Sequence, residues 1–226
     1  MKLVIFDCDG TLVDSQHNIT AAMAYAFAAH DLACPPVPEV LSIVGLSLPQ
    51  CFEVLAGQHS ASVQTSLAEQ YRNAFLSGKL AHSLEEPLYP GIADAVRLLA
   101  ARDDVHLGVA TGKSRRGVAR LFDREGWHPH FHTIQTADDH PSKPHPSMIL
   151  KAMDDAGVGP DATVMIGDTA FDMEMARNAR VGAVGVGWGY HATDRLVAAG
   201  AHTVVTDGAL LLDAVERQFA AQDTSR

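Results

Sequence analysis

The chain has 226 residues, 47% of them hydrophobic, and a formal charge of −10. That acidity argues against a general nucleic-acid or anionic-membrane surface, so an anionic ligand must be met by a local cationic site. The three cysteines form no CxxC pair and indicate neither a disulfide framework nor a thiolate zinc site. Because the first apolar run is also too short for a signal peptide, we expect a cytoplasmic protein.

A buried strand followed by two acids opens the chain. The apolar run 3–6 suits a parallel strand covered on both faces, and it leads directly into Asp7, Cys8, Asp9 and Gly10. Because side chains alternate along a strand, Asp7 and Asp9 share one side while Cys8 turns toward the core. Two carboxylates this close repel each other unless a proton or a cation lies between them. The pair predicts a divalent metal, an acid–base partnership or both; the alternative is an Asx turn that caps a helix.

A long helical stretch then interrupts the strands. An alanine-rich helix is predicted to run to about residue 30, with Asp14 or Ser15 placed to cap it. Further helices are predicted over 50–55 and 63–76, separated by proline-rich breaks. We therefore expect an α/β core made of residues 1–14 and 86–226, with a helical insertion over 15–85.

From residue 87 onward, helices alternate with strands. Helices are predicted over 92–101, 115–126, 146–156 and 171–179, and strands over 105–110, 133–136, 163–166 and 183–186. Such alternation indicates a Rossmann-like, doubly wound parallel sheet, with the site at the carboxyl ends of the strands. The tail 221–226 is expected to be frayed.

Three further motifs each lie just past a predicted strand. Thr111 places a hydroxyl at a strand end, and Gly112 permits close backbone approach to an anion. Lys143 lies in a loop that prolines hold in place, which would aim its ammonium group. Asp168 and Asp172 are four residues apart and can share one side of a turn that enters a helix. Taken singly, such residues are also typical of helix caps and solvated lysines, but the sheet topology would bring them beside the first two acids.

The motifs Asp-x-Asp-Gly-Thr, Thr-Gly, Lys-Pro-x-Pro and Gly-Asp-x-x-x-Asp occur in this order. That order resembles the haloacid dehalogenase superfamily, specifically its phosphatase branch. The resemblance extends from Leu3 to about Tyr190, and the helical insertion looks like the first-position (C1-type) cap domain of that family. The overall pattern is similar to that of phosphoglycolate phosphatases.

The resemblance implies a mechanism and a cofactor. Asp7 would be the nucleophile that forms an aspartyl-phosphate, and Asp9 would be the general acid and base. Mg²⁺ is the implied metal, held by the carboxylates of Asp7 and Asp168 and by the backbone carbonyl of Asp9. Asp172 would order the water shell of the metal or bind it directly.

The same resemblance assigns a group of residues to the phosphoryl oxygens. These are Thr111, Lys143 and the backbone N–H groups near Asp9, Gly10 and Gly112.

Substrate choice is expected to come from the cap. Similar proteins place a substrate-facing loop near residues 45–48 and Gln50, and Arg72 or Lys79 would supply charge for an anionic leaving group. The expected partner is a small phosphorylated metabolite, with no nucleic acid and no membrane, and the protein is expected to be a monomer or a homodimer.

Several alternatives stay open on the sequence. Metal-free dehalogenases of the superfamily lack the second acid of the first motif, so Asp9 favours phosphoryl chemistry. A sugar-phosphate mutase resembling β-phosphoglucomutase and an inorganic pyrophosphatase are enzymatic alternatives, and a phospho-aspartate receiver domain is a non-enzymatic one. Cys8 is either a core residue or a redox-sensitive thiol. The histidines at 128, 130, 132, 140 and 145 are either an exposed loop or a zinc site.

Overall fold

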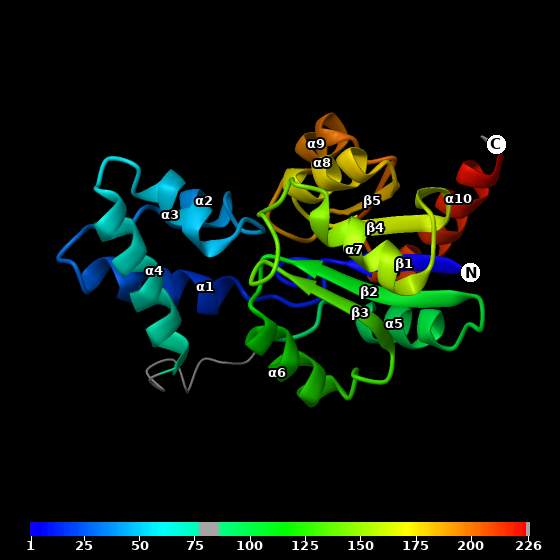
Figure 1. Cartoon of the computed structure of the whole chain (residues 1–226), viewed down its shortest axis with the longest axis horizontal. Helices are drawn as coiled ribbons and strands as arrows, with labels where there is room; N and C mark the ends of the chain where they lie inside the picture. Colours follow the sequence, from blue (N-terminus) through cyan, green and yellow to red (C-terminus); the bar gives the residue numbers. More distant parts are fainter. Residues whose placement is uncertain (77–85, 225–226) are drawn as a thin grey trace.

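A computed structural model describes residues 1–76 and 86–224 (Figure 1). Within them, six parallel strands form one sheet in the order β3-β2-β1-β4-β5-β6. The strands are β1 (Lys2–Phe6), β2 (Val105–Thr111), β3 (Phe131–Thr136), β4 (Thr163–Gly167), β5 (Gly182–Val186) and β6 (Thr203–Val205). The helices are α1 (Gln16–Ala28), α2 (Val37–Leu41), α3 (Leu48–Leu55), α4 (Ala61–Leu76), α5 (Ile92–Ala100), α6 (Arg115–Glu125), α7 (Ser147–Ala156), α8 (Ala170–Ala179), α9 (Thr193–Ala199) and α10 (Leu211–Thr224).

The central strand β1 shows why the sheet is covered on both faces. Its side chains alternate, so Val4 and Phe6 join the core formed with α5, α6 and α10, whereas Leu3 and Ile5 join the core formed with α7, α8 and α9. All four are fully buried. The predicted doubly wound α/β fold is confirmed, and burial on both faces accounts for the unbroken apolar run.

The position of β1 also determines where a site can form. It pairs with β2 on one side and with β4 on the other, so the order of connection reverses at this strand. Ligands of open α/β sheets bind outside the carboxyl ends of the strands at such a switch point. Asp7, Thr111 and Asp168 lie at the ends of these three strands.

A helical insertion follows β1, as the sequence predicts. Helices α1–α4 pack around a separate apolar core that includes Met23, Phe27, Phe52 and Leu67. They form the blue-to-cyan lobe at the left of Figure 1, beside the carboxyl end of the sheet. We call this lobe the cap; the predicted boundary at residue 85 lies outside the described residues.

The ends of the cap and of the chain differ in detail from the predictions. At the start of α1 the N-cap residue is Ser15, but its side chain makes no capping hydrogen bond. The preceding Asp14 satisfies the first turn instead, since its Oδ1 accepts a hydrogen bond from the N–H of Gln16 at 3.1 Å. The prediction of a frayed tail from residue 221 is wrong as far as Thr224, because α10 continues to that residue. This helix buries Val215 and Phe219 against the sheet, and that packing stabilises it. Short elements α2, α9 and β6 were not predicted, since they contain too few residues for a periodic pattern.

None of the helices in the described ranges combines the length and the hydropathy that a membrane crossing requires.

Candidate active site

Three carboxylates and one lysine converge at the carboxyl end of the sheet. Carboxylate oxygens of Asp7, Asp168 and Asp172 lie within 4.8 Å of one another, and all three residues are buried. Lys143 Nζ lies 2.8 Å from Asp7 Oδ2 and 2.6 Å from Asp172 Oδ1, and the lysine is also fully buried. The four residues come from the ends of β1 and β4, from α8 and from the loop before α7. The topology therefore brings together residues that are far apart in the sequence.

The cluster carries more negative than positive charge. Burial, and next the neighbouring Asp172, raise the pKa of Asp7 to about 6 although Lys143 opposes the rise. Burial, and next the negative charges of Asp172 and Asp7, raise the pKa of Asp168 as well. Burial disfavours the charged Lys143, but Asp172 and Asp7 outweigh this cost and raise its pKa. One lysine with a raised pKa thus shares a buried site with three acids.

Asp168 is held in a single orientation by two donors. The hydroxyl of Thr11 donates to its Oδ1 at 2.8 Å, and the backbone N–H of Tyr190 donates to its Oδ2, also at 2.8 Å. Gly10 has a φ of 82°, and a Cβ there would collide with the Asp168 carboxylate. The glycine of the first motif is therefore required both by the turn and by the close approach of this acid.

Asp172 is fixed by the first turn of α8. Its Oδ2 accepts hydrogen bonds from the Thr169 backbone N–H at 3.0 Å and from the Thr169 hydroxyl at 2.7 Å. The Asp172 N–H donates back to the Thr169 hydroxyl oxygen at 3.4 Å, and this reciprocal pair of backbone-to-side-chain bonds is a capping box. The positive end of the helix dipole adds to the stabilisation of this carboxylate. Its other oxygen remains directed at Lys143.

The donor set fits a hard divalent cation. Asp7 Oδ1 accepts a hydrogen bond from the Cys8 N–H at 2.7 Å, whereas its Oδ2 has only the charge contact with Lys143 and no hydrogen bond within the described residues. Buried carboxylates in excess of the available positive charge are the environment that Mg²⁺ prefers. The residues that could hold the ion are Asp7, Asp168 and Asp172.

The side chain of Asp9 points away from this cluster. Its Oδ1 accepts a hydrogen bond from Lys113 Nζ at 2.6 Å, and the same ammonium lies 3.1 Å from the Glu86 carboxylate. The two carboxylates outweigh the effect of burial and raise the pKa of Lys113. The sequence had singled out neither Lys113 as the partner of Asp9 nor Glu86 as the second partner of that lysine. Lys113 directly follows the Thr-Gly motif, but nothing in the local sequence marks Glu86.

The other predicted phosphate-binding groups lie close by, but some of them already form hydrogen bonds within the protein. Thr111 is fully buried at the end of β2, and its hydroxyl accepts a hydrogen bond from the Lys113 N–H at 3.2 Å. The N–H of Gly10 donates to the carbonyl oxygen of Val13 at 2.9 Å. A Cβ at Gly112 would come within 2.8 Å of two backbone carbonyl oxygens in the cap loop, those of Gly45 and Leu46. Gly112 therefore permits close contact between core and cap.

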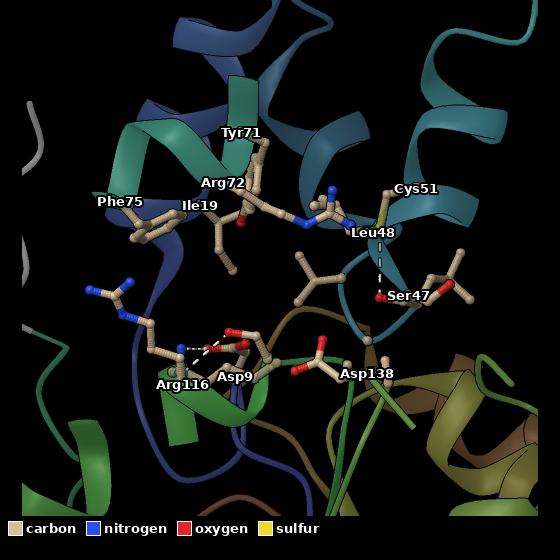
Figure 2. A pocket seen from close by; sticks show the side chains of 18 of the residues that line it. Asp9, Ile19, Ser47, Leu48, Cys51, Tyr71, Arg72, Phe75, Arg116 and Asp138 are labelled. Carbon is tan, nitrogen blue, oxygen red and sulfur yellow. Dashed lines mark hydrogen bonds and ion pairs between the residues drawn. The ribbon is translucent and has the colours of Figure 1, made fainter. Parts of the chain in front are cut away.

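A cavity of about 550 Å³ lies between the cap and α6 (Figure 2). Asp9, Gly112 and Lys113 line its core side, and Arg72 contributes from α4. The predicted loop 45–48 lines the cavity as well. Gln50 is exposed outside it, and Lys79 lies outside the described residues.

Two alternatives from the sequence lose support. Cys8 is fully buried, and burial raises the pKa of its thiol, so the side chain behaves as part of the core. Within the described residues, the acid cluster Asp7, Asp168 and Asp172 is the group of ligand-type side chains close enough to hold a metal. His132 lies on β3, not in a loop, and its Nε2 donates a hydrogen bond to the carbonyl oxygen of Asp155 at 3.1 Å.

Comparison with known proteins identifies the family. The family model described as "Haloacid dehalogenase-like hydrolase" matches residues 4–186. The chain belongs to the haloacid dehalogenase-like hydrolases, as the order of its motifs predicted, and the relatives described next are phosphatases by name.

The similarity extends over nearly the whole chain. A probable phosphatase, IndB, from Dickeya dadantii is 36% identical over 208 residues, which cover 90% of this chain and 88% of the relative. A phosphoglycolate phosphatase from Pseudomonas putida is 32% identical over 195 residues, covering 84% and 71%. The crystal structure of a predicted phosphatase from Clostridium acetobutylicum superimposes with a TM-score of 0.84 at 25% identity, covering 96% of this chain and 98% of that one.

Proposed function

We propose that this protein is a Mg²⁺-dependent phosphatase of small phosphorylated metabolites that works through an aspartyl-phosphate on Asp7. The observation that supports the proposal most directly is the buried cluster of Asp7, Lys143, Asp168 and Asp172 at the switch point of the sheet. Membership of the hydrolase family and the phosphatase names of the relatives agree with it.

In the first step, an Asp7 oxygen attacks phosphorus and the bond from phosphorus to the leaving oxygen breaks. Asp9, which borders the cavity, donates a proton to the departing alkoxide. When bound, Mg²⁺ neutralises charge on the phosphoryl oxygens and on the acids that hold it. Lys143 contributes a fixed positive charge beside Asp7, and Thr111 offers a hydroxyl to a phosphoryl oxygen.

In the second step, Asp9 accepts a proton from water, whose oxygen attacks phosphorus. The bond between Asp7 and phosphorus breaks, and inorganic phosphate is released with Asp7 restored as a carboxylate. To take part in both proton transfers, Asp9 must leave its ion pair with Lys113. Loop 45–47 contacts the core, where the Ser47 N–H donates to Ser142 Oγ at 2.7 Å, so the cap is positioned to exclude water during the first step.

The test is phosphate release from a panel of phosphoglycolate, pyrophosphate, nucleoside monophosphates and sugar phosphates, with Mg²⁺ or with EDTA. Release should require the metal and should be lost in Asp7→Asn, because an amide is a poor nucleophile toward phosphorus. Acid quenching of the wild type should trap one phosphoryl group that hydroxylamine removes, and the variant should trap none. Full metal-dependent turnover by Asp7→Asn would refute the mechanism. Isomerised product with little free phosphate would indicate the mutase instead.

A further inference from the structure

The cavity between the cap and α6 is larger and more apolar than a two-carbon leaving group requires. A volume of about 550 Å³ lies within the range of about 300–1,000 Å³ typical of pockets that bury ligands of drug size. Apolar cap side chains form much of its wall, among them Ile19, Met23, Val44, Leu48, Tyr71 and Phe75. Figure 2 shows Ile19, Tyr71 and Phe75 on the cap side, opposite Asp9 on the core side.

Three arginines add a second chemical feature to this cavity. Arg72 comes from α4 in the cap, and Arg116 and Arg120 come from α6 in the core. Within residues 1–76 and 86–224, the side chains of Arg72 and Arg116 form neither an ion pair nor a hydrogen bond. The guanidinium carbon of Arg120 lies 5.8 Å from the centre of the Phe75 ring, a cation–π contact that joins core and cap across the cavity.

Each acid that lines the cavity has a donor of its own or shares one. Asp9 and Glu86 share Lys113, and Asp138 accepts a hydrogen bond from the Arg115 N–H at 2.8 Å. Four cations, Arg72, Lys113, Arg116 and Arg120, line the cavity together with three acids, so its lining carries a net charge of +1 although the chain as a whole is acidic. A guanidinium group binds carboxylates and phosphates with two parallel hydrogen bonds.

We propose that the preferred substrates are phosphomonoesters whose leaving group has a bulky apolar body and carries a second anionic group, bound by Arg72 and Arg116. This inference rests on the proposed function, because it takes Asp9 as the proton donor to the leaving group. Since Asp9 borders the cavity, the leaving group lies inside it when the phosphoryl group reaches Asp7.

Four primary alkyl phosphates separate the effect of size from that of charge. Ethyl phosphate is small and has no second anionic group, and phosphoglycolate is small with a carboxylate. Benzyl phosphate is bulky without a second anionic group, and 4-carboxybenzyl phosphate combines bulk with a carboxylate. We expect 4-carboxybenzyl phosphate to exceed each of the other three in kcat/KM by about tenfold or more, which corresponds to about 1.4 kcal/mol.

Arginine variants test the charge directly. Arg72→Met and Arg116→Met should each lower kcat/KM for 4-carboxybenzyl phosphate by about tenfold, with a much smaller loss for benzyl phosphate. Arg217→Met is the matched control, because Arg217 pairs with Asp213 on α10 and does not line the cavity. Equal losses on both benzyl substrates, or a preference for phosphoglycolate, would overturn the inference.

Binding separates this inference from the proposed function. If the wild type turned over none of the four esters with Mg²⁺, the proposed phosphatase activity would fail. Calorimetric titration of 4-carboxybenzyl phosphate into the wild type and into Arg72→Met would still test whether the cavity binds the leaving group. Weaker binding by the variant supports the assignment, and equal or undetectable binding refutes it.

Discussion

Replacing Asp7 by asparagine should stabilise the metal-free protein at neutral pH while abolishing turnover. In the fold, the Asp7 carboxylate is buried beside Asp172, and its negative charge is opposed more by burial than it is favoured by Lys143. Asparagine has nearly the same shape and no charge. The substitution therefore removes an unfavourable ionisation and keeps the packing.

The size of the effect follows from the pKa of Asp7, which rises from its ordinary 3.8 to about 6. Between pH 3.8 and about 6, Asp7 keeps a proton in the folded protein that it has already lost in the unfolded chain. Folding stability therefore falls as pH rises through this window and stays lower above it. At about 1.4 kcal/mol per pH unit, the loss above pH 7 is about 3 kcal/mol. Asp7→Asn avoids it and should unfold roughly 6–12 °C higher at pH 7.5.

The assay is thermal and urea unfolding of both proteins in EDTA at pH 7.5 and near pH 4. The advantage of the variant should shrink to below about 1 kcal/mol at the acidic pH, where the unfolded wild type is itself partly protonated. Asp103→Asn, at an exposed position, controls for the loss of one acidic charge and should show no such dependence. A variant less stable than the wild type at pH 7.5, or equally favoured at both pH values, would refute the reasoning.

Three further predictions concern the neighbours of this acid. Mg²⁺ at about 100 times its Kd should stabilise the wild type by about 2.7 kcal/mol in thermal unfolding, and Asp168→Asn should lose most of this response. Gly112→Ala should cost about 1–3 kcal/mol in the contact between core and cap, seen as lower stability and lower kcat/KM, because the added Cβ meets the cap-loop carbonyls. Lys113→Met should lower the free energy of unfolding by about 3 kcal/mol, since it leaves two carboxylates unpaired in a largely buried site. Lys151→Met, at an exposed ion pair, should cost below about 1 kcal/mol in the same urea titration.

Each of these has an outcome that contradicts it. An unchanged Mg²⁺ response in Asp168→Asn would exclude that acid as a ligand. Wild-type kinetics and stability in Gly112→Ala would show that the cap loop does not depend on close contact there. Equal costs for the two lysine substitutions would mean that the pairing of Lys113 with Asp9 contributes nothing beyond a surface ion pair.

The sequence by itself predicted the class of fold and the convergence of Asp7, Asp168 and Asp172 at one edge of the sheet. The apolar run before Asp7 and the alternation of helices and strands are local patterns, and they predict a parallel sheet whose strand ends meet. Each of the four clustered residues belongs to a short motif that follows a predicted strand, so the sequence predicts that they converge; they are Asp7, Lys143, Asp168 and Asp172.

The tertiary structure alone decided what surrounds those acids. Lys113 pairs with both Asp9 and Glu86, and Tyr190 orients Asp168, through contacts between residues 22 to 104 positions apart. Gly112 packs closely against the cap loop. The apolar wall of the cavity comes from the cap, and two of its arginines come from α6. Periodicity reports which face of an element is buried but not which distant element covers it. Contacts that form only where the cap packs against the α/β core therefore leave no local signal in the sequence.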